Sequence, residues 1–442
     1  MKQKLDLSLR AIADNIVFSK NEVWAYYRAD TTGYDFLNDN SKIMLLSNIS
    51  QVFANMMANK DERIDMHVLI TNTPVNIDHW EDQFLQITSS WKRKPGFNKY
   101  FAEQVEYLKM REFMCRRVYI GVKLMNRHEV TVKSLSKQLE NGVGAMLSFI
   151  REELFTPVGA NDYAISKKEM KTARMMETDF YNFFHGSELL CNRASTEELA
   201  LVNKRIFYPS MPTPYLDVPA KSRWGKGDIC RELGVDMVCR NRWLEITQPI
   251  LGDMATGYRA TLSFTKFPDE MNVPGGYPWI YLTQKIGSPY DISARLTLIP
   301  NKKMKKEVNN QKRDLEDEAN NMSEGHHNLS LDLQQDYNQA MQLEAYTAKN
   351  DDPWLEGTFR IVITDPDLEN LKQDVEIIKN GYSTAGITLT WTAGDQVDLM
   401  LETMIGDHIR DDSFKQTSNV ELIGASGFNI FDKVGDDDMK DA

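Results

Sequence analysis

The stretch ISARLTL, residues 292–298, alternates apolar and polar side chains along its whole length. Successive side chains of a β-strand point to opposite faces of a sheet, so this period of two predicts a strand with one buried face. Residues 64–70, IDMHVLI, show the same alternation, with an apolar residue at every even position. These two strands, one in each half of the chain, are the starting point for interpreting the fold.

The elements predicted around these strands follow a similar order in both halves. Each half runs strand, helix, strand, paired or broken helices, strand, helix, which predicts an α/β (α+β) fold with two similar βαβ-containing units. The predicted domains are a first α/β unit over 1–155, a helical connector or inserted subdomain over 156–256, a second α/β unit over 257–410, and a lead-in to a further domain over 411–442. Strands are predicted at 16–18, 23–27, 64–70, 113–125, 258–267, 292–298, 359–363 and 387–391. Helices are predicted from Ser41 to Met57, at 130–154, 166–184 and 195–207, and from Asp365 to Gly381.

A long antiparallel helical hairpin is predicted over residues 302–349, with its turn at Gly325. Apolar residues recur on one stripe of its first helix. This stripe is the candidate partner-contact surface of the chain, and the alternative is that it packs into the core. Its residues are Met304, Val308, Leu315 and Met322.

Composition limits the classes of function. The chain has 442 residues, of which 42% are hydrophobic and 26% charged, so it is long enough for more than one domain and is typical of folded proteins. Its formal net charge of −12 makes direct nucleic-acid binding an unfavourable interpretation, because phosphate binding needs a field of Lys and Arg. The four cysteines show no CxxC pair, which argues against a zinc site or a disulfide framework. No run approaches the 18 or so apolar residues of a membrane span, so we expect any membrane contact to be peripheral or through a partner.

The known catalytic patterns are missing from the sequence. No GxxxxGK[ST] phosphate loop and no GxSxG nucleophile elbow is present. His326 and His327 fall in the predicted hairpin turn, while packing or capping explains His67 and His185. Asp365 and Asp395 stand at predicted helix starts, where a carboxylate satisfies free backbone N–H groups. We therefore predict no catalytic, cofactor-binding or metal-binding residue in this chain.

The second half nevertheless resembles a known family. The features are a strand over 258–267 that ends at Pro268, the segment at Trp279, residues 292–300, the charged helical pair, Trp354 before a strand, Gly394-Asp395-Gln396 and Met404-Ile405-Gly406. In this order they resemble the N-terminal region of type IV secretion and conjugation ATPases, above all the TraE-like and ConE-like forms of Gram-positive conjugative elements. These are relatives of the TraC and TrbE proteins and of the largest VirB ATPase.

The resemblance implies a docking and assembly role. In this family a segment similar to Ser426-Gly427-Phe428 leads into a RecA-like motor domain, which we expect to follow residue 442. ATP and Mg²⁺ would bind only that domain, so this chain is expected to be inactive alone. The implied partners are membrane components of a conjugation channel at the cytoplasmic face of the membrane, with a homo-oligomeric full-length protein. The alternative from a different class is a stand-alone scaffold or binding protein of a mobile element or phage.

Overall fold

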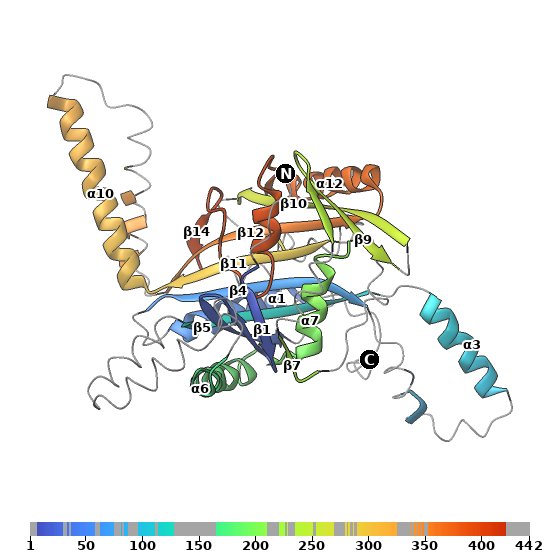
Figure 1. Cartoon of the computed structure of the whole chain (residues 1–442). Helices are drawn as coiled ribbons and strands as arrows, with labels where there is room; N and C mark the ends of the chain where they lie inside the picture. The colour runs from blue at the N-terminus through green and yellow to red at the C-terminus, as the bar shows by residue number, and fades with distance from the viewer. Residues whose placement is uncertain are drawn as a thin grey trace, which may run out of the picture.

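The computed structural model has a mixed α/β fold built on one large antiparallel sheet (Figure 1). It describes residues 7–29, 33–34, 37–57, 62–74, 81, 84–86, 96–110, 114–127, 165–209, 221–225, 228, 235–250, 253–268, 279–280, 282, 286, 290–324, 337, 340–341, 343–345, 347–348 and 352–420. The predicted helix at 130–154, the hairpin turn with His326 and His327, and the segment 421–442 lie outside these residues.

The sheet contains fourteen described strands, and each pairing is antiparallel. They are β1 (Leu9–Ala13), β2 (Ile16–Ser19), β3 (Glu22–Ala29), β4 (Ile64–Pro74), β5 (Met114–Asn126), β6 (Asn192–Arg193), β7 (Arg223–Trp224), β8 (Asp236–Cys239), β9 (Leu244–Ile250), β10 (Asp253–Lys266), β11 (Asp291–Ile299), β12 (Trp354–Asp365), β13 (Thr388–Thr390) and β14 (Gln416–Asn419). The described helices are α1 (Asp39–Met57), α3 (Phe97–Met110), α6 (Lys167–His185), α7 (Thr196–Arg205), α10 (Asn301–Glu324), α12 (Leu368–Ser383) and α13 (Gln396–Glu402).

The two alternating stretches, residues 64–70 and 292–298, pair with each other. β4 and β11 run side by side at the middle of the sheet, with Ile64 opposite Leu298 and Ile70 opposite Ile292. From this pair outward, the order is β4-β5-β3-β2-β1 on one side and β11-β12-β10-β9-β8 on the other. In addition, β6 pairs with β3 and β13 pairs with β10. These five strands on each side follow the same order, and β7 pairs with β1 at the outer edge of the first side.

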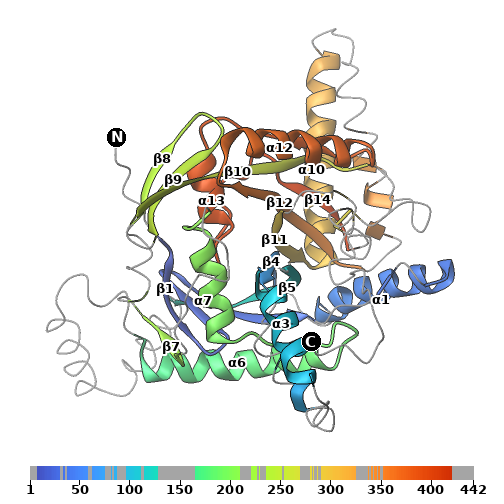
Figure 2. The ribbon, with the colours of Figure 1, turned by 90° about the vertical axis from the view of Figure 1, so that its right-hand side faces the viewer.

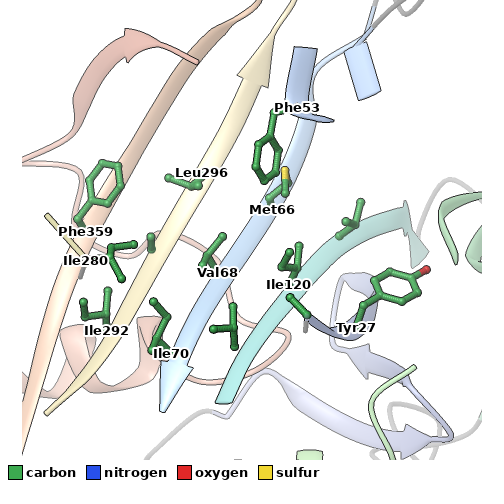
Figure 3. Packing of buried hydrophobic residues seen from close by; sticks show 14 of the residues in the cluster. Tyr27, Phe53, Met66, Val68, Ile70, Ile120, Ile280, Ile292, Leu296 and Phe359 are labelled. Carbon is green, nitrogen blue, oxygen red and sulfur yellow. The ribbon is translucent and has the colours of Figure 1, made fainter. Parts of the chain in front are cut away.

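Apolar residues of α1, α6 and α12 cover one face of the sheet. The main hydrophobic core lies there and runs without interruption through both halves (Figure 3). Its strand residues come from the positions that the alternation predicts, such as Met66, Val68, Leu296 and Phe359. Three helices follow the predicted pattern closely: α6 and α7 begin at capping boxes formed by Ser166 and Ser195, and α12 buries Leu371, Val375 and Ile378.

The second face of the sheet, covered by α7 and α13, differs from the prediction. Alternation in β4 and β11 predicts one buried face, yet His67, Ser293 and Arg295 on the other face are at most 2% exposed. A further hydrophobic cluster lies on this face and includes Leu199 of α7 and Met400 of α13. The prediction was wrong here because a polar residue at alternate strand positions marks a change of face and does not show whether water or another layer covers that face.

The region predicted as a helical connector, 156–256, also supplies strands. Besides α6 and α7, it contains β6, β7, β8 and β9, for which no strand was predicted. The predicted boundary between residues 256 and 257 falls inside β10, which pairs with β9 from Asp253 to Arg259. This part of the chain is thus built into the same sheet as the strands that follow it.

Candidate functional site

α10, which carries the predicted contact stripe, projects from the sheet as an arm (Figure 1 and Figure 2). Its 24 residues correspond to about 36 Å at 1.5 Å of rise per residue. The helix starts directly after β11, where the backbone N–H groups of Lys303 and Met304 donate to the carbonyl of Pro300. The arm is therefore a direct continuation of a central strand.

The base of the arm is anchored by apolar contacts. Met304 and Val308 are 7% and 1% exposed and form a small cluster with Ile299 and Trp354, against which Leu343 also packs. Half of the predicted contact stripe is thus buried where the arm joins the body. A partner could reach Met304 and Val308 only by opening this cluster.

The distal part of the arm is more accessible. Leu315 is partly exposed, and the side chain of Met322 lies outside the described residues. Two contacts join this part of α10 to the chain that returns toward β12: Lys312 Nζ lies 2.9 Å from Glu344 Oε2, and the Tyr337 hydroxyl donates to Glu316 Oε1 at 3.2 Å. Leu315 is therefore the described member of the stripe that is best placed to meet a partner.

Lysines crowd the first turns of α10. Lys302, Lys303 and Lys306 are exposed, and the first turn contains no acidic residue. The N-terminus of a helix carries a partial positive charge, so the interaction of these lysines with the helix dipole does not stabilise the helix. They place a local positive patch at the base of the arm of an acidic protein.

A serine–histidine contact lies on the second face of the sheet. Nε2 of His67 is 2.9 Å from Oγ of Ser293, and Nδ1 is 3.0 Å from the hydroxyl of Tyr26. The backbone N–H of Gly406 donates to the same hydroxyl at 2.9 Å, which leaves the phenol proton for Nδ1 and the Nε2 proton for Ser293. Burial, reinforced by the charge of Arg295, lowers the pKa of His67 well below its usual value.

This contact is structural and not catalytic. Tyr26 and His67 are 0% exposed and Ser293 is 1% exposed, so a substrate has no access to the imidazole or to the hydroxyl. The three side chains instead connect β3, β4 and β11 with the turn at Gly406. The prediction that packing explains His67 is confirmed. His185 is exposed, stacks on Tyr181, and lies with Nδ1 3.2 Å from the carbonyl oxygen of Cys191.

A buried ion pair lies further along the same face. Glu402 of α13 is 0% exposed and accepts from Arg360 Nε at 3.0 Å and from Thr358 Oγ1 at 2.6 Å. Its second oxygen accepts from the backbone N–H groups of Arg410 and Asp411, at 3.1 and 3.2 Å. Because the carboxylate is fully hydrogen-bonded, it holds the segment after α13 against the sheet.

The predicted acidic helix starts need one correction. The N-cap of α12 is Asp367, whose side chain accepts from the N–H groups of Glu369 and Asn370, and not Asp365. Asp365 instead accepts from the N–H of Asp367 at 2.6 Å, just before the helix. Asp395 stands at the N-cap position of α13 but makes no capping hydrogen bond through its side chain.

Sequence reasoning missed the polar layer on the second face. A signal was present, since the polar positions of β10, β11 and β12 are mostly Ser, Thr and Arg and seldom Lys or Glu. Arg and the small hydroxyl residues are the types that can be hydrogen-bonded in an interior. The layer includes Arg259, Thr261, Ser263, Ser293, Arg295, Thr358 and Arg360.

Comparison with known proteins adds no assignment: no family model matches the chain, and no curated protein shows significant similarity to it. Within the described part of the chain, no group of three or more His, Cys, Asp or Glu side chains is arranged to hold a metal ion. None of the described helices has the length and apolar character needed to cross a bilayer.

Proposed function

We propose that this chain is the N-terminal docking and assembly region of a type IV secretion (conjugation) ATPase, which helps to drive DNA or protein transfer across the cell envelope. In this role it positions a motor domain at the cytoplasmic face of the membrane and binds channel components there. ATP and Mg²⁺ belong to the motor domain, and the residues of this chain supply contacts only.

The observation that carries the proposal is that the segments resembling the family pack against one another. Gln396, from the Gly394-Asp395-Gln396 segment, accepts from the N–H of Thr261 in β10 at 2.8 Å and donates to its carbonyl at 3.1 Å. Arg295 of β11 donates to the carbonyl of Glu402 at 2.9 Å and also to that of Met404. The resemblance therefore follows one packed part of the molecule and not a set of scattered segments.

The proposed organisation includes two similar α/β units. Supporting it, the orders β6-β3-β5-β4 and β13-β10-β12-β11 match, and in each the first and second long strands are separated by the third. This is the split β-α-β arrangement of ferredoxin-like units. The connections that contain α3 and α10 occupy equivalent places, between the second and third of these long strands in each half.

The proposed contact element is the distal part of the helical hairpin. The base of α10 is fixed by buried Met304 and Val308, whereas Leu315 is accessible and charged residues surround it. An arm held at one end can reach a membrane-bound partner while the sheet stays clear of the bilayer. A homo-oligomeric full-length protein would present several such arms to one channel.

Crosslinking in source cells tests this proposal. Tagged chain is crosslinked, purified from the membrane fraction, and its neighbours are identified by mass spectrometry, for wild type and for Leu315→Glu. We expect channel components to be captured by wild type, with recovery at least about tenfold lower for Leu315→Glu, since a buried unpaired charge costs several kcal/mol at an interface. Glu307→Gln, an exposed change near the arm's base, is the matched control and should capture normally.

One outcome would count against the docking role, and another against the arm as its contact element. Capture of soluble proteins of a mobile element or phage, with no channel component, would favour the stand-alone scaffold. Equal capture of channel components by wild type and Leu315→Glu would leave the docking role in place but remove the arm as its contact element.

A further inference from the structure

A row of side chains crosses four neighbouring strands on the second face of the sheet. Asp291 of β11 and Thr261 of β10 are both register partners of Val362 in β12. Thr71 takes the matching position on β4, one residue beyond the last β4 residue paired with β11. Because neighbouring strands lie about 4.8 Å apart, this row spans about 14 Å.

Two guanidinium groups meet this row. Arg205, at the end of α7, donates to Thr71 Oγ1 and lies 3.5 Å from Asp291 Oδ2. Arg259, two residues before Thr261 on β10, donates from Nη2 to Thr403 Oγ1 at 2.7 Å. The charge of Asp291 favours the charged form of Arg259 and that of Arg205 opposes it, so the three groups are near one another.

The charges in this group do not balance. Burial lowers the pKa of Arg259 only to about 10, so its guanidinium stays protonated at neutral pH. Among the described residues, the carboxylate of Asp291 pairs with Arg205, and its charge also favours the charged forms of Arg259 and Arg116. Arg259 is 3% exposed, and a buried charge without a counter-ion is strongly unfavourable.

Two buried polar atoms here also lack partners. Nε of Arg259 and Oγ1 of Thr261 make no hydrogen bond with any described residue. Both residues project from the same face of β10, since residues i and i+2 of a strand share a face. A buried donor without an acceptor is destabilising, so native proteins normally satisfy such groups.

We propose that Arg259 and Thr261, with Arg205 on the more exposed side, bind a small oxyanion. A carboxylate or phosphate oxygen would accept from Nε of Arg259 and from the hydroxyl of Thr261, and its charge would complete the pairing of the two arginines. The burial of Arg259 and Thr261 restricts the ligand to a small ion, so the site does not take a nucleotide. It is independent of the docking role of the arm.

Thermal unfolding of the whole chain at pH 7 and constant ionic strength tests the site, with phosphate, sulfate or acetate replacing chloride. An anion that binds only the folded state raises Tm in a concentration-dependent manner, so we expect a rise of several degrees that continues logarithmically above Kd. Thr261→Val, which keeps the shape but removes the hydroxyl, should weaken the effect at least fivefold in apparent Kd. Arg259→Met should abolish it. The anion with the lowest apparent Kd shows whether the site prefers a phosphate-like or a carboxylate-like ligand.

Two further variants make the test specific. Asp291→Asn removes the competing carboxylate and should tighten anion binding by about tenfold. Arg240→Gln, at an exposed arginine paired with Glu245, should leave anion binding unchanged.

Sulfate and phosphate also stabilise proteins non-specifically by exclusion from their surfaces. Equal Tm shifts in wild type, Thr261→Val and Arg259→Met would therefore overturn the proposal, as would the lack of any shift with all three anions. If Arg259→Met does not fold, the other two variants test the proposal, because Thr261→Val should weaken anion binding and Asp291→Asn should tighten it.

Discussion

The imidazole of His67 joins the two halves of the sheet through its Nε2 atom, 2.9 Å from Oγ of Ser293. These residues belong to β4 and β11, the central antiparallel pair, and both are buried. This contact adds a buried hydrogen bond to the apolar packing between the two strands. It also makes the junction sensitive to protonation.

We expect stability to fall as pH decreases below about 6.5. The pKa of His67 is lowered in the folded protein, so only the unfolded state gains a proton there as pH falls through the unfolded value. Stability is unaffected by this residue at higher pH, and the loss reaches about 1.4 kcal/mol at pH 5.5.

Urea unfolding at pH 7.5, 6.5 and 5.5 measures this effect. His67→Gln is the comparison, because the glutamine amide does not titrate. The variant should lose less stability than wild type between pH 6.5 and 5.5, whatever its absolute stability. The same pH dependence in both proteins would show that His67 is not the group responsible.

Glu402→Gln is expected to destabilise the fold by about 3–5 kcal/mol. The change removes the closer of the two carboxylates beside the buried guanidinium of Arg360 and, among the described residues, leaves only Asp411 Oδ2, 3.9 Å from Nη2. Breaking a buried pair from one side costs about this much. Denaturant unfolding gives the difference. Glu369→Gln breaks an exposed pair with Lys372 and should change stability by less than about 1 kcal/mol. Similar losses in the two variants would contradict the assignment of Glu402 as a buried anchor.

Gly406→Ala should cost more than Gly394→Ala. Both glycines have positive φ, +70° and +96°, so both substitutions carry a backbone penalty of about 1–2 kcal/mol. A Cβ at Gly406 would also lie 2.5 Å from Ser19 Oγ and 2.7 Å from Val17 Cγ1, whereas nothing lies within 4 Å at Gly394. Overpacking typically adds about 1–3 kcal/mol, which a comparison of unfolding midpoints will resolve. Equal losses would mean that the turn moves away from β2 freely.

Val308→Ala is expected to lower the free energy of unfolding by about 1–3 kcal/mol, because it opens a cavity in the cluster at the base of α10. Leu315→Ala, further along the same stripe, should cost less than about 1 kcal/mol. Denaturant unfolding of both variants measures the two losses, and a larger loss for Val308→Ala would show that the base of α10 anchors the helix. A larger loss for Leu315→Ala would show that Leu315 is also packed in the core and is not an accessible contact residue.

The period of two in residues 64–70 and 292–298, and the helical periodicity of α1, α6, α7 and α12, could be recognised without a structure. Periodicity reports which side chains share a face, and that is a local property of the chain. Capping residues are local too, although the cap of α12 is Asp367 and not Asp365. Asp365 accepts from the N–H of Asp367, which lies just before the helix, whereas Asp367 accepts from the N–H groups of its first turn.

The sequence by itself therefore determined the α/β character, most of the long strands and helices, and the helix that begins after residue 300. Only the tertiary structure decided that β4 pairs with β11, that the polar face is buried, and that His67, Arg259 and Glu402 lie within it. The central β4–β11 pairing joins residues more than 200 positions apart, and Arg259 meets Thr403 across 144 positions. Such contacts are selected by the packing free energy of the whole sheet, and no local pattern of side chains records them.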